Sequence, residues 1–498
     1  MQKQRRNLTA LLLFALGLSM SRATAQESRA AASAADPMVA TSHRIVSEIQ
    51  QNNEVMENLE YLADLIGPRL TGTPNMTRAS RWTMERFHRY GLANVHLESW
   101  TIARAWYRGT AQGRILSPAE HPLTLASAGW SPSTAGAVRG PVVYVSARRV
   151  EDLQPFQGKL KGAIVIVAEP EILPAPFEAP RSPLLTPMPP PPSGPDLRTH
   201  AFERARDAFF KAQGVAAVLR DSGKDHSLLN MGGVGGRHYD VGTVPTAFVT
   251  AEGYRQIWRL LKRGPVEVEV ELKNSFSDKP VEVYNTVAEI RGRERSDEVV
   301  ILGAHLDSWD LGTGTTDNGT GSMAVLEAAR ALQKLDLKPK RTIRFLLFSG
   351  EEQGLNGSRA YVEAHKSELG KISAVLVHDT GTGRVLSIGL QGNYQDREVL
   401  DRILAPLRDL GLSELSLRSA RGTDHVSFND VGVPGFFCVQ DPAEYAKTHH
   451  SQSDTFDKVW KGDLVQGAQV LAVWAYGVAE WPDMLPRGPA PTAAGGSE

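Results

Sequence analysis

The sequence predicts an α/β protein with a mixed, mostly parallel central sheet flanked by helices, and with a β-rich domain inserted into it. Three observations predict this fold. The chain has 498 residues, of which 41% are hydrophobic, and this is more than one ordinary domain needs. From residue 281 onwards, apolar strand patterns alternate with helical patterns, which is typical of a parallel sheet. Between residues 118 and 278, short β runs dominate instead, which indicates a separate domain.

Residues 1–25 have the pattern of a cleavable export signal. A basic start at Lys3–Arg6 precedes an apolar run at Leu8–Met20, and Ala23–Ala25 form a small-x-small cleavage sequence. The apolar run is shorter than the ~20 residues of a membrane-spanning helix. We therefore expect a secreted or periplasmic protein without stable membrane insertion. The paired arginines leave both the general and the twin-arginine export routes open.

Charge and cysteine content exclude several classes of protein. The formal net charge of −1 argues against nucleic acid as a partner. The single cysteine, Cys438, cannot form an intramolecular disulfide. Because it lies in the apolar run "GVPGFFCVQD", we predict a buried structural thiol.

Residues 26–117 are expected to form the N-terminal part of the main domain. Apolar residues recur at helical spacing between 42 and 90. The stretch "GPRLTGTPN" at Gly67–Asn75 interrupts this spacing, and its Gly, Pro and Asn content predicts a loop.

Residues 118–278 are interpreted as the inserted domain. Its β runs are "GPVVYVS", "GAIVIVA", "GVAAVLR" and "VPTAFVT", at 140–146, 162–168, 214–220 and 244–250. The proline-dense stretch 170–195 predicts an extended excursion rather than a core element. We expect the insert and this excursion to cover the functional site and limit substrate length.

Residues 279–486 are expected to form the main domain, followed by a flexible tail at 487–498. The predicted buried strands lie within 297–305, 341–352, 372–379 and 433–441. The predicted helices span 320–335, 355–367 and 396–410.

Metal-binding side chains follow each of these strands. In an open α/β sheet, ligands bind beyond the carboxyl ends of the strands, so these residues should converge. Taken singly, each of them is an ordinary turn, cap or surface residue; only the set indicates a site. The set comprises His305, Asp317, Glu351, Glu352, Asp379, His449 and His450.

A metal centre accounts best for this concentration of acids. Several carboxylates in one crevice repel each other unless a cation lies among them. Lysine and arginine are scarce in these stretches, and Lys447 is the nearest to a candidate ligand. Histidine and carboxylate ligands suit zinc. Five ligands from this set of seven residues exceed what one tetrahedral zinc with a water requires, whereas two zinc ions ~3.5–4 Å apart would use all five.

The motifs "GAHLDSWDLGTGTTDNG", "LLFSGEEQGLNGSRAY" and "HHSQSDT" resemble the co-catalytic zinc exopeptidases, the aminopeptidases and carboxypeptidases whose peptidase domain carries a protease-associated domain insert. The resemblance extends to "LIGPRLTGTPN" and to "VLAVWAYGVAEWPDMLPR" near the C-terminus. It therefore covers nearly all of the chain after the export signal. A single motif is a weak signal, but the full set in this order is specific.

The resemblance implies a role for each residue of the set. His450 is preferred to its neighbour because the family histidine stands four residues before an Asp-Thr pair, here Asp454-Thr455. Asp424 and His425, in "RGTDHVSF", are weaker candidates for substrate contact. The remaining roles are that His305 and Asp379 bind one zinc ion, Glu352 and His450 bind the other, Asp317 bridges both, Glu351 is the general base, and Asp307 orients the His305 ring.

The function implied is a secreted dizinc metallo-exopeptidase that hydrolyses short peptides or dipeptides. Which peptide terminus it recognises stays open, as does the native metal, since manganese or cobalt also suits these ligands. Relatives often form dimers, so a homodimer is a candidate assembly. Two alternatives are a glutaminyl cyclase-like acyltransferase with one zinc ion and a receptor-like binding module. The five filled ligand positions disfavour the first, and Glu351 disfavours the second.

Overall fold

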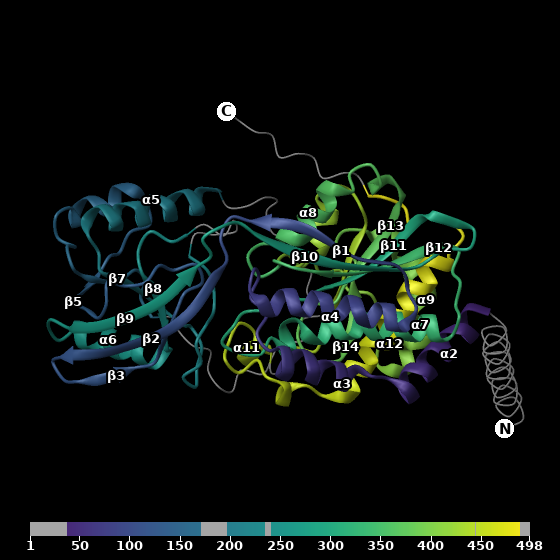
Figure 1. The fold of residues 1–498 in the computed structure, drawn as a ribbon, viewed down its shortest axis with the longest axis horizontal. Helices are drawn as coiled ribbons and strands as arrows, with labels where there is room; N and C mark the ends of the chain where they lie inside the picture. The colour runs from purple at the N-terminus through teal and green to yellow at the C-terminus, as the bar shows by residue number, and fades with distance from the viewer. Residues whose placement is uncertain (1–36, 171–196, 235–240, 444, 489–498) are drawn as a thin grey trace, which may run out of the picture.

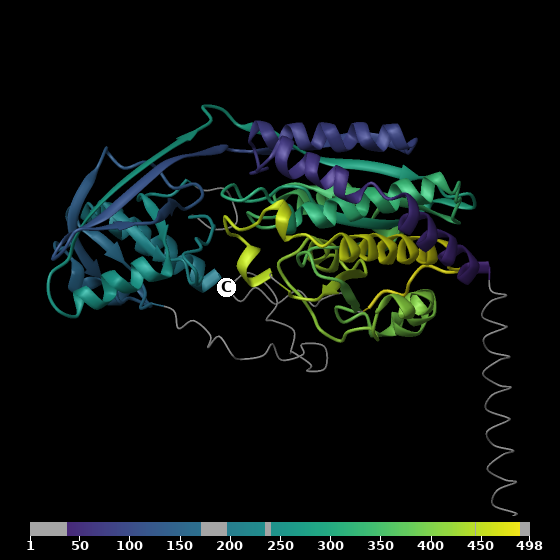
Figure 2. The same ribbon diagram turned by 90° about the horizontal axis from the view of Figure 1, so that it is seen from below.

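Two β-sheets organise the computed structural model of the chain, one in each of two units that lie side by side (Figures 1 and 2). The structure describes residues 37–170, 197–234, 241–443 and 445–488. The predicted export signal lies outside the described residues, as do nearly all of the proline-dense stretch and the last ten residues of the tail.

The main unit is built on a seven-stranded sheet with the strand order β1-β10-β12-β11-β13-β15-β14. Its four central strands, from β12 to β15, are parallel neighbours, and the outer pairings are antiparallel. This confirms the predicted mixed sheet with a parallel centre. The strands are β1 (Ala93–Ile102), β10 (Val281–Ile290), β11 (Arg295–His305), β12 (Arg341–Phe348), β13 (Ile372–Val377), β14 (Val385–Gly389) and β15 (Gly435–Gln440).

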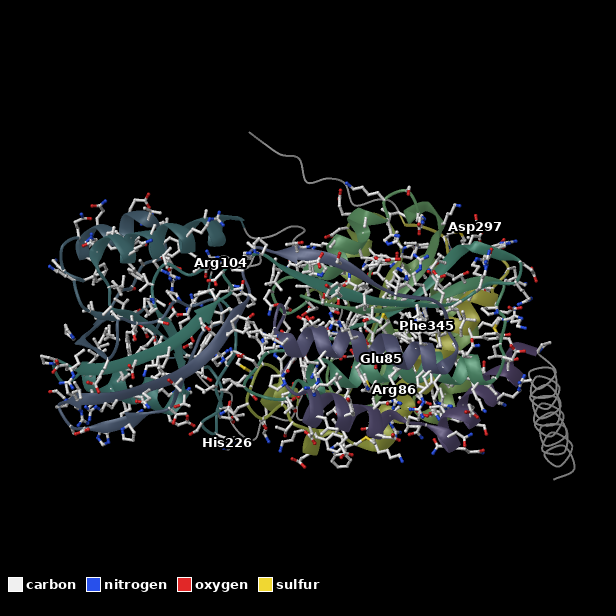
Figure 3. The ribbon with its side chains drawn as sticks, in the orientation of Figure 1. Glu85, Arg86, Arg104, His226, Asp297 and Phe345 are labelled. Atoms are coloured by element: carbon white, nitrogen blue, oxygen red, sulfur yellow. The ribbon has the colours of Figure 1, made fainter. Side chains whose placement is uncertain are left out.

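The central strands are apolar on both faces because helices cover both faces. In β12, Phe345 points to one side and Phe348 to the other, as the two-residue period of a strand requires. Phe345 lies in the middle of the main unit (Figure 3) and its ring centroid is 6.2 Å from that of Phe87 in α4. Phe348 packs instead against Tyr361 and Phe428, from α8 and α10.

Helix α4 (Pro74–Tyr90) begins and ends where the sequence has capping signals. In α4, the Thr73 side chain accepts a hydrogen bond from the Met76 N–H, Pro74 occupies the first turn, and Gly91 ends the helix with φ +82°. The helices are α2 (Pro37–Asn52), α3 (Val55–Glu60), α4 (Pro74–Tyr90), α7 (Thr320–Lys334), α8 (Asn356–Ala364), α9 (Arg397–Leu404), α10 (His425–Asn429), α11 (Tyr445–Thr448) and α12 (Lys461–Glu480).

The second unit, which we call the insert (residues 106–276), is built on an eight-stranded sheet with the order β3-β2-β9-β5-β6-β7-β8-β4. The long strands β2 and β9 pair with each other and reach toward the main unit (Figure 1). The elements are β2 (Trp106–Ser117), β3 (His121–Leu123), β4 (Leu125–Ser127), β5 (Val138–Tyr144), β6 (Ile164–Ile166), α5 (Leu197–Gln213), β7 (Ala217–Asp221), β8 (Thr246–Val249), α6 (Ala251–Leu261) and β9 (Glu267–Phe276).

The antiparallel strands β1, β2, β9 and β10 were not among the strands expected from the sequence. The first three carry many half-exposed polar residues, so they lack the continuous apolar run that identified the central strands. The boundary drawn at residue 118 falls at the end of β2, although β2 pairs with β9 within the insert. Among the described residues, no helix combines the length and the apolarity that crossing a bilayer requires.

Candidate active site

The carboxyl ends of three neighbouring parallel strands bring the candidate residues together. His305 is the last residue of β11, while Glu351 and Asp379 follow β12 and β13 by three and two residues. The strands stay paired up to these ends, because the Leu306 N–H donates to the Phe348 carbonyl at 2.7 Å. The side chains that follow them therefore share one edge of the sheet.

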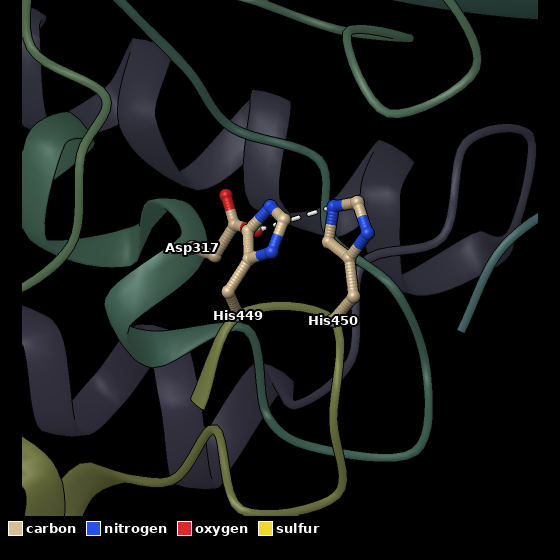
Figure 4. A group of neighbouring side chains, drawn as sticks. All are labelled: Asp317, His449 and His450. Carbon is tan, nitrogen blue, oxygen red and sulfur yellow. Dashed lines mark ion pairs between the residues drawn. The ribbon is translucent and has the colours of Figure 1, made fainter. Parts of the chain in front are cut away.

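Asp317 lies between the two histidines that the sequence analysis singled out. Its Oδ1 is 3.2 Å from His305 Nε2, and its Oδ2 is 3.5 Å from His450 Nε2. Figure 4 shows the carboxylate facing the His450 ring. One carboxylate thus offers an oxygen to each side, which is the arrangement that a bridging ligand requires.

The remaining acids fall on either side of Asp317. On one side, Asp379 Oδ1 is 3.0 Å from His305 Nε2, and Glu351 Oε2 is 4.0 Å from the same nitrogen. On the other side, Glu352 Oε2 is 2.9 Å from His450 Nε2. The pairing of His305 with Asp379 and of His450 with Glu352 is the pairing that the resemblance implies.

His449 lies farther from the acids than His450 does. Its Nε2 is 3.8 Å from Asp317 Oδ2, and its side chain is 41% exposed. Its ring stacks on that of His450, with 3.8 Å between the ring centroids (Figure 4). The geometry therefore favours His450 as the ligand, with His449 against its ring.

Asp307 contacts the His305 ring chiefly through its backbone carbonyl. The nearest partner of His305 Nδ1 is the backbone carbonyl of Asp307, at 3.0 Å, while the carboxylate is 3.6 Å away. A carbonyl only accepts, so Nδ1 donates this hydrogen bond, and Nε2, which faces the acids, is the nitrogen that a metal would bind. The Asp307 carboxylate accepts the Thr71 hydroxyl and the N–H groups of Glu351 and Glu352.

A buried cation near the acids comes from the loop at Gly67–Asn75, which sequence reasoning did not connect to the site. Arg69 is fully buried and donates to the carbonyls of Leu306, Thr313 and Gly314. These bonds fix the loop between His305 and Asp317. Arg69 also places a positive charge near the acids, where the sequence analysis had expected few basic residues. In the sequence, the only sign of this role was an arginine between glycine and proline residues in an apolar stretch.

Asp454 was used only to choose between two histidines, but it also holds the loop of Asp317. Its carboxylate accepts the N–H groups of Thr316 and Asp317, at 2.5 and 3.2 Å. Burial raises its pKa to about 7. Because Asp454 holds these two backbone N–H groups, the Asp317 carboxylate stays in place between the histidines.

Burial and mutual repulsion perturb the acids strongly. Burial raises the pKa of Glu351 and of Glu352 well above the usual range, and the charge of Asp379 adds to both. Burial opposes a charged His305, but Asp379 and Glu351 outweigh it and raise its pKa. For Asp317, burial raises the pKa, but the hydrogen bond with His305 and the charges of His450 and His449 together outweigh burial and lower it. A divalent cation among these groups would stabilise the charged carboxylates.

The donor atoms fit zinc. Ligands bound at ~2.0–2.2 Å in a tetrahedron lie ~3.3–3.6 Å apart, close to the separations of 3.2 and 3.5 Å from Asp317 to the two histidines. Within the described chain, no hydrogen bond reaches Asp317 Oδ2 or Glu352 Oε1. Three overlapping groups have ligand atoms within 4.8 Å of one another: Asp317, His449 and His450; His305, Glu351 and Asp379; and His305, Asp317 and Glu352.

The two candidates for substrate contact are buried side chains. Asp424 lies close enough to Glu351 for its charge to raise the pKa of that group, and burial raises its own pKa to about 7. His425 stacks on Phe437 at 5.5 Å and contacts Gln391. Burial lowers the pKa of His425 to about 3. Asp424 thus borders the site, whereas His425 packs beside Phe437.

Comparison with known proteins agrees with this geometry. The model of peptidase family M28 matches residues 285–475. Carboxypeptidase Q of Rattus norvegicus is 32% identical over 438 residues, covering 87% of each chain. The crystal structure of a peptidase M28 precursor from Shewanella amazonensis is 27% identical, with a TM-score of 0.75 over 91% of this chain and 99% of that one. A zinc aminopeptidase from Bacillus subtilis, at 21% identity and a TM-score of 0.62 over 86% of this chain and 98% of its own, shares the fold.

The motif resemblance is therefore confirmed over most of the chain, by relatives that share both its sequence and its fold. The chain belongs to peptidase family M28 and is a zinc exopeptidase of that family.

Proposed function

We propose that the chain is an exported exopeptidase that binds two zinc ions and hydrolyses short peptides, dipeptides included, with Glu351 as the general base. The observation that carries this proposal is the placement of Asp317, whose two oxygens face His305 and His450 at 3.2 and 3.5 Å. His305 and Asp379 would hold one ion, Glu352 and His450 the other, and Asp317 would bind both.

Glu351 is suited to proton transfer. It is 9% exposed and lies next to the ligand cluster. Neither of the two proposed metal positions uses it as a ligand, so its carboxylate is available for proton transfer. Bound zinc supplies a Lewis acid for the scissile carbonyl and lowers the pKa of the attacking water. The raised pKa of Glu351 favours a carboxylate that takes the water proton and later delivers it to the leaving amine.

The substrate class is proposed from the relatives. Their names include both carboxypeptidases and aminopeptidases, so the reaction common to them is removal of a terminal residue. Among the described residues, Met231 of the insert lines the metal-site cavity together with Trp309 and His450. Because a residue of the insert lies directly against the metal site, short peptides are favoured as substrates over folded proteins.

The test is zinc analysis combined with a peptide panel on the wild type and on Glu351→Gln. We expect two zinc ions per chain in both proteins. Activity of the variant should fall by ~10²–10⁴-fold, the usual contribution of a general base. The panel should include free dipeptides, longer peptides, peptides blocked at either end, and a peptide with N-terminal glutamine.

The matched control is Glu363→Gln, which changes an exposed glutamate on α8 and should leave both readings unchanged. Full hydrolysis by Glu351→Gln would remove Glu351 as the base. Cyclisation of the glutaminyl peptide without hydrolysis of any other would replace the peptidase proposal with the acyltransferase.

Export is proposed from the pattern of residues 1–25 alone, and these lie outside the described residues. The N-terminal residue of the chain recovered from the medium or periplasm tests it. We expect the chain to begin near Gln26. Recovery of the uncleaved chain inside the cell would contradict export.

A further inference from the structure

The insert contacts the backbone that carries His450. The contacts come from one stretch between β7 and β8, residues 222–231, which we call the docking segment; His226, on this segment, is labelled in Figure 3. The segment reaches the loop between α11 and α12, which holds His449 and His450. No sequence motif predicted this contact.

Four hydrogen bonds join the docking segment to α11 and to the loop that follows it. The Met231 N–H donates to the His450 carbonyl at 2.8 Å, and Lys224 Nζ donates to the Ala446 carbonyl at 2.9 Å. Gln452 makes the other two. Its Oε1 accepts the Leu229 N–H at 2.8 Å, and its Nε2 donates to the Ser227 carbonyl at 3.2 Å.

His450 has a backbone that needs such support. Its φ is +53°, in the left-handed region that residues with a side chain adopt rarely. Residues held there persist where the surrounding structure fixes them. The bond from Met231 to the His450 carbonyl, with Gln452 two residues later, fixes the chain at this position and directly after it.

The docking segment is itself anchored within the insert. The Ser227 N–H donates to Glu252 Oε1 at 2.9 Å, and the Gly129 N–H donates to the Gly232 carbonyl at 2.8 Å. Met231 is 4% exposed, and its sulfur accepts the Leu311 N–H at 3.1 Å. Movement of the segment would therefore break contacts on both units.

The two proposed metal positions differ in this respect. His305 is the last residue of a core strand, and Asp379 follows the adjacent one. Glu352 also follows a core strand, but His450 lies on a loop that is hydrogen-bonded to the insert. Among the proposed ligands in the described residues, only His450 is itself hydrogen-bonded through its backbone to the insert.

We propose that the docking segment is a positioning element for His450, so that zinc affinity at the Glu352–His450 position depends on the insert while affinity at the His305–Asp379 position does not. The proposal rests on the proposed role of His450 as a ligand. Gln452 is the residue through which it is tested, because its side chain makes two of the four bonds and does not reach the acids.

The experiment measures zinc per chain for the full-length enzyme in chelator buffers that set the free zinc concentration. The proteins are the wild type, Gln452→Ala, Gln452→Glu and the control Gln395→Ala. Gln395 also hydrogen-bonds a backbone carbonyl, that of Pro486, and both residues belong to the main unit. Melting temperatures check that each variant is folded.

For Gln452→Ala, we expect one zinc-binding step to shift to ~10-fold or more higher free zinc, in the range that loss of a supporting contact causes. The other step should stay in place, and activity should return in excess zinc. Gln452→Glu keeps the acceptor for Leu229 and loses the donor to Ser227, so its shift should be smaller.

Equal zinc curves for Gln452→Ala, Gln395→Ala and the wild type would overturn the inference. A shift of both steps together would also overturn it, because it would show a general loss of structure. His450→Ala separates this from the proposed function: if that variant keeps the full zinc content of the wild type, His450 is not a ligand and the proposed metal assignment fails.

Discussion

The two sheets of the molecule share a design but differ in whether the side chains at their strand ends come together. Each contains four parallel neighbours, β12-β11-β13-β15 in the main unit and β5-β6-β7-β8 in the insert. In the main unit, His305 ends β11, and Glu351 and Asp379 follow β12 and β13 by three and two residues. The insert also has acids at its strand ends, Asp221 at the end of β7 and Glu169 and Glu252 three residues after β6 and β8, but among the described residues they form no group that could hold a metal. A parallel sheet supplies an edge where side chains meet, and the residues placed there decide whether that edge performs chemistry.

The insert takes part in the site through support. Its docking segment contacts the His450 loop. Arg108 of β2 forms a bidentate ion pair with Asp310, with N–O distances of 2.7 and 2.9 Å. Asp310 lies on the loop that begins after His305. One sheet therefore provides the proposed ligands, and the other holds the loops between them.

The largest effect is expected for a substitution of Arg69, with Arg341 as the comparison, since both arginines are fully buried. Arg69→Met leaves the carbonyls of the Leu306–Gly314 loop without their donor, and each buried unpaired group costs ~1–3 kcal/mol. We expect a loss of stability together with at least a ~10-fold fall in kcat/KM and weaker zinc retention. Thermal unfolding, zinc analysis and peptide hydrolysis measure these effects.

Arg341→Met is the matched control, because Arg341 binds Glu298 and the Pro482 carbonyl away from the site. It should lower the melting temperature without changing zinc retention or the kcat/KM of the folded enzyme. If Arg69→Met behaves in the same way, then Arg69 supports the fold only and the loop does not depend on it.

An intermediate effect should distinguish two arginines on β2. Arg108 and Asp310 are 9% and 14% exposed, so Arg108→Leu removes a largely buried ion pair with charge-assisted bonds of ~1.5–3 kcal/mol each. Arg114 pairs with Glu120 and Glu269 at the surface, where water screens the interaction. We expect Arg108→Leu to lower the melting temperature and reduce kcat/KM severalfold.

Arg114→Leu should leave both quantities close to those of the wild type. Measurement of both variants in low and high salt sharpens the comparison, since salt weakens exposed ion pairs more than buried ones. Equal behaviour of the two variants would mean that the contact between β2 and the Asp310 loop has no influence on the site.

The smallest effect concerns Asp396, a buried carboxylate away from the proposed metal positions. Neither of its oxygens has a hydrogen-bond partner among the described residues, and burial raises its pKa from 3.8 to about 7. The folded chain therefore keeps a proton that the unfolded chain releases between these values. The stability from this group is complete below the lower value and is lost as the pH rises through about 7.

Asp396→Asn removes this titration. We expect the variant to melt at a higher temperature than the wild type at pH 8, and the difference to shrink as the pH falls to 6, with both proteins saturated with zinc. A difference that is constant across this range would show that the carboxyl of Asp396 does not titrate there.

Much of the main unit could be predicted because its signals are local. The apolar runs of β11, β12, β13 and β15 are continuous, as strands buried on both faces require, and the helices between them follow a 3.6-residue period. The residues at the strand ends followed from the same patterns. In contrast, β1, β2 and β9 carry mixed polar and apolar residues, and their pairing depends on partners far away in the sequence.

By itself, the sequence determined the parallel sheet, the set of residues at its carboxyl edge and the family, since each is written in short contiguous motifs. Only the tertiary structure decided that Arg69 and Asp454 fix the loop of Asp317, and that the insert contacts the His450 loop. The physical reason is that these contacts are made of individual hydrogen bonds between residues more than 100 positions apart. A side chain leaves no periodic or local trace of such a partner, and only the folded chain brings the two together.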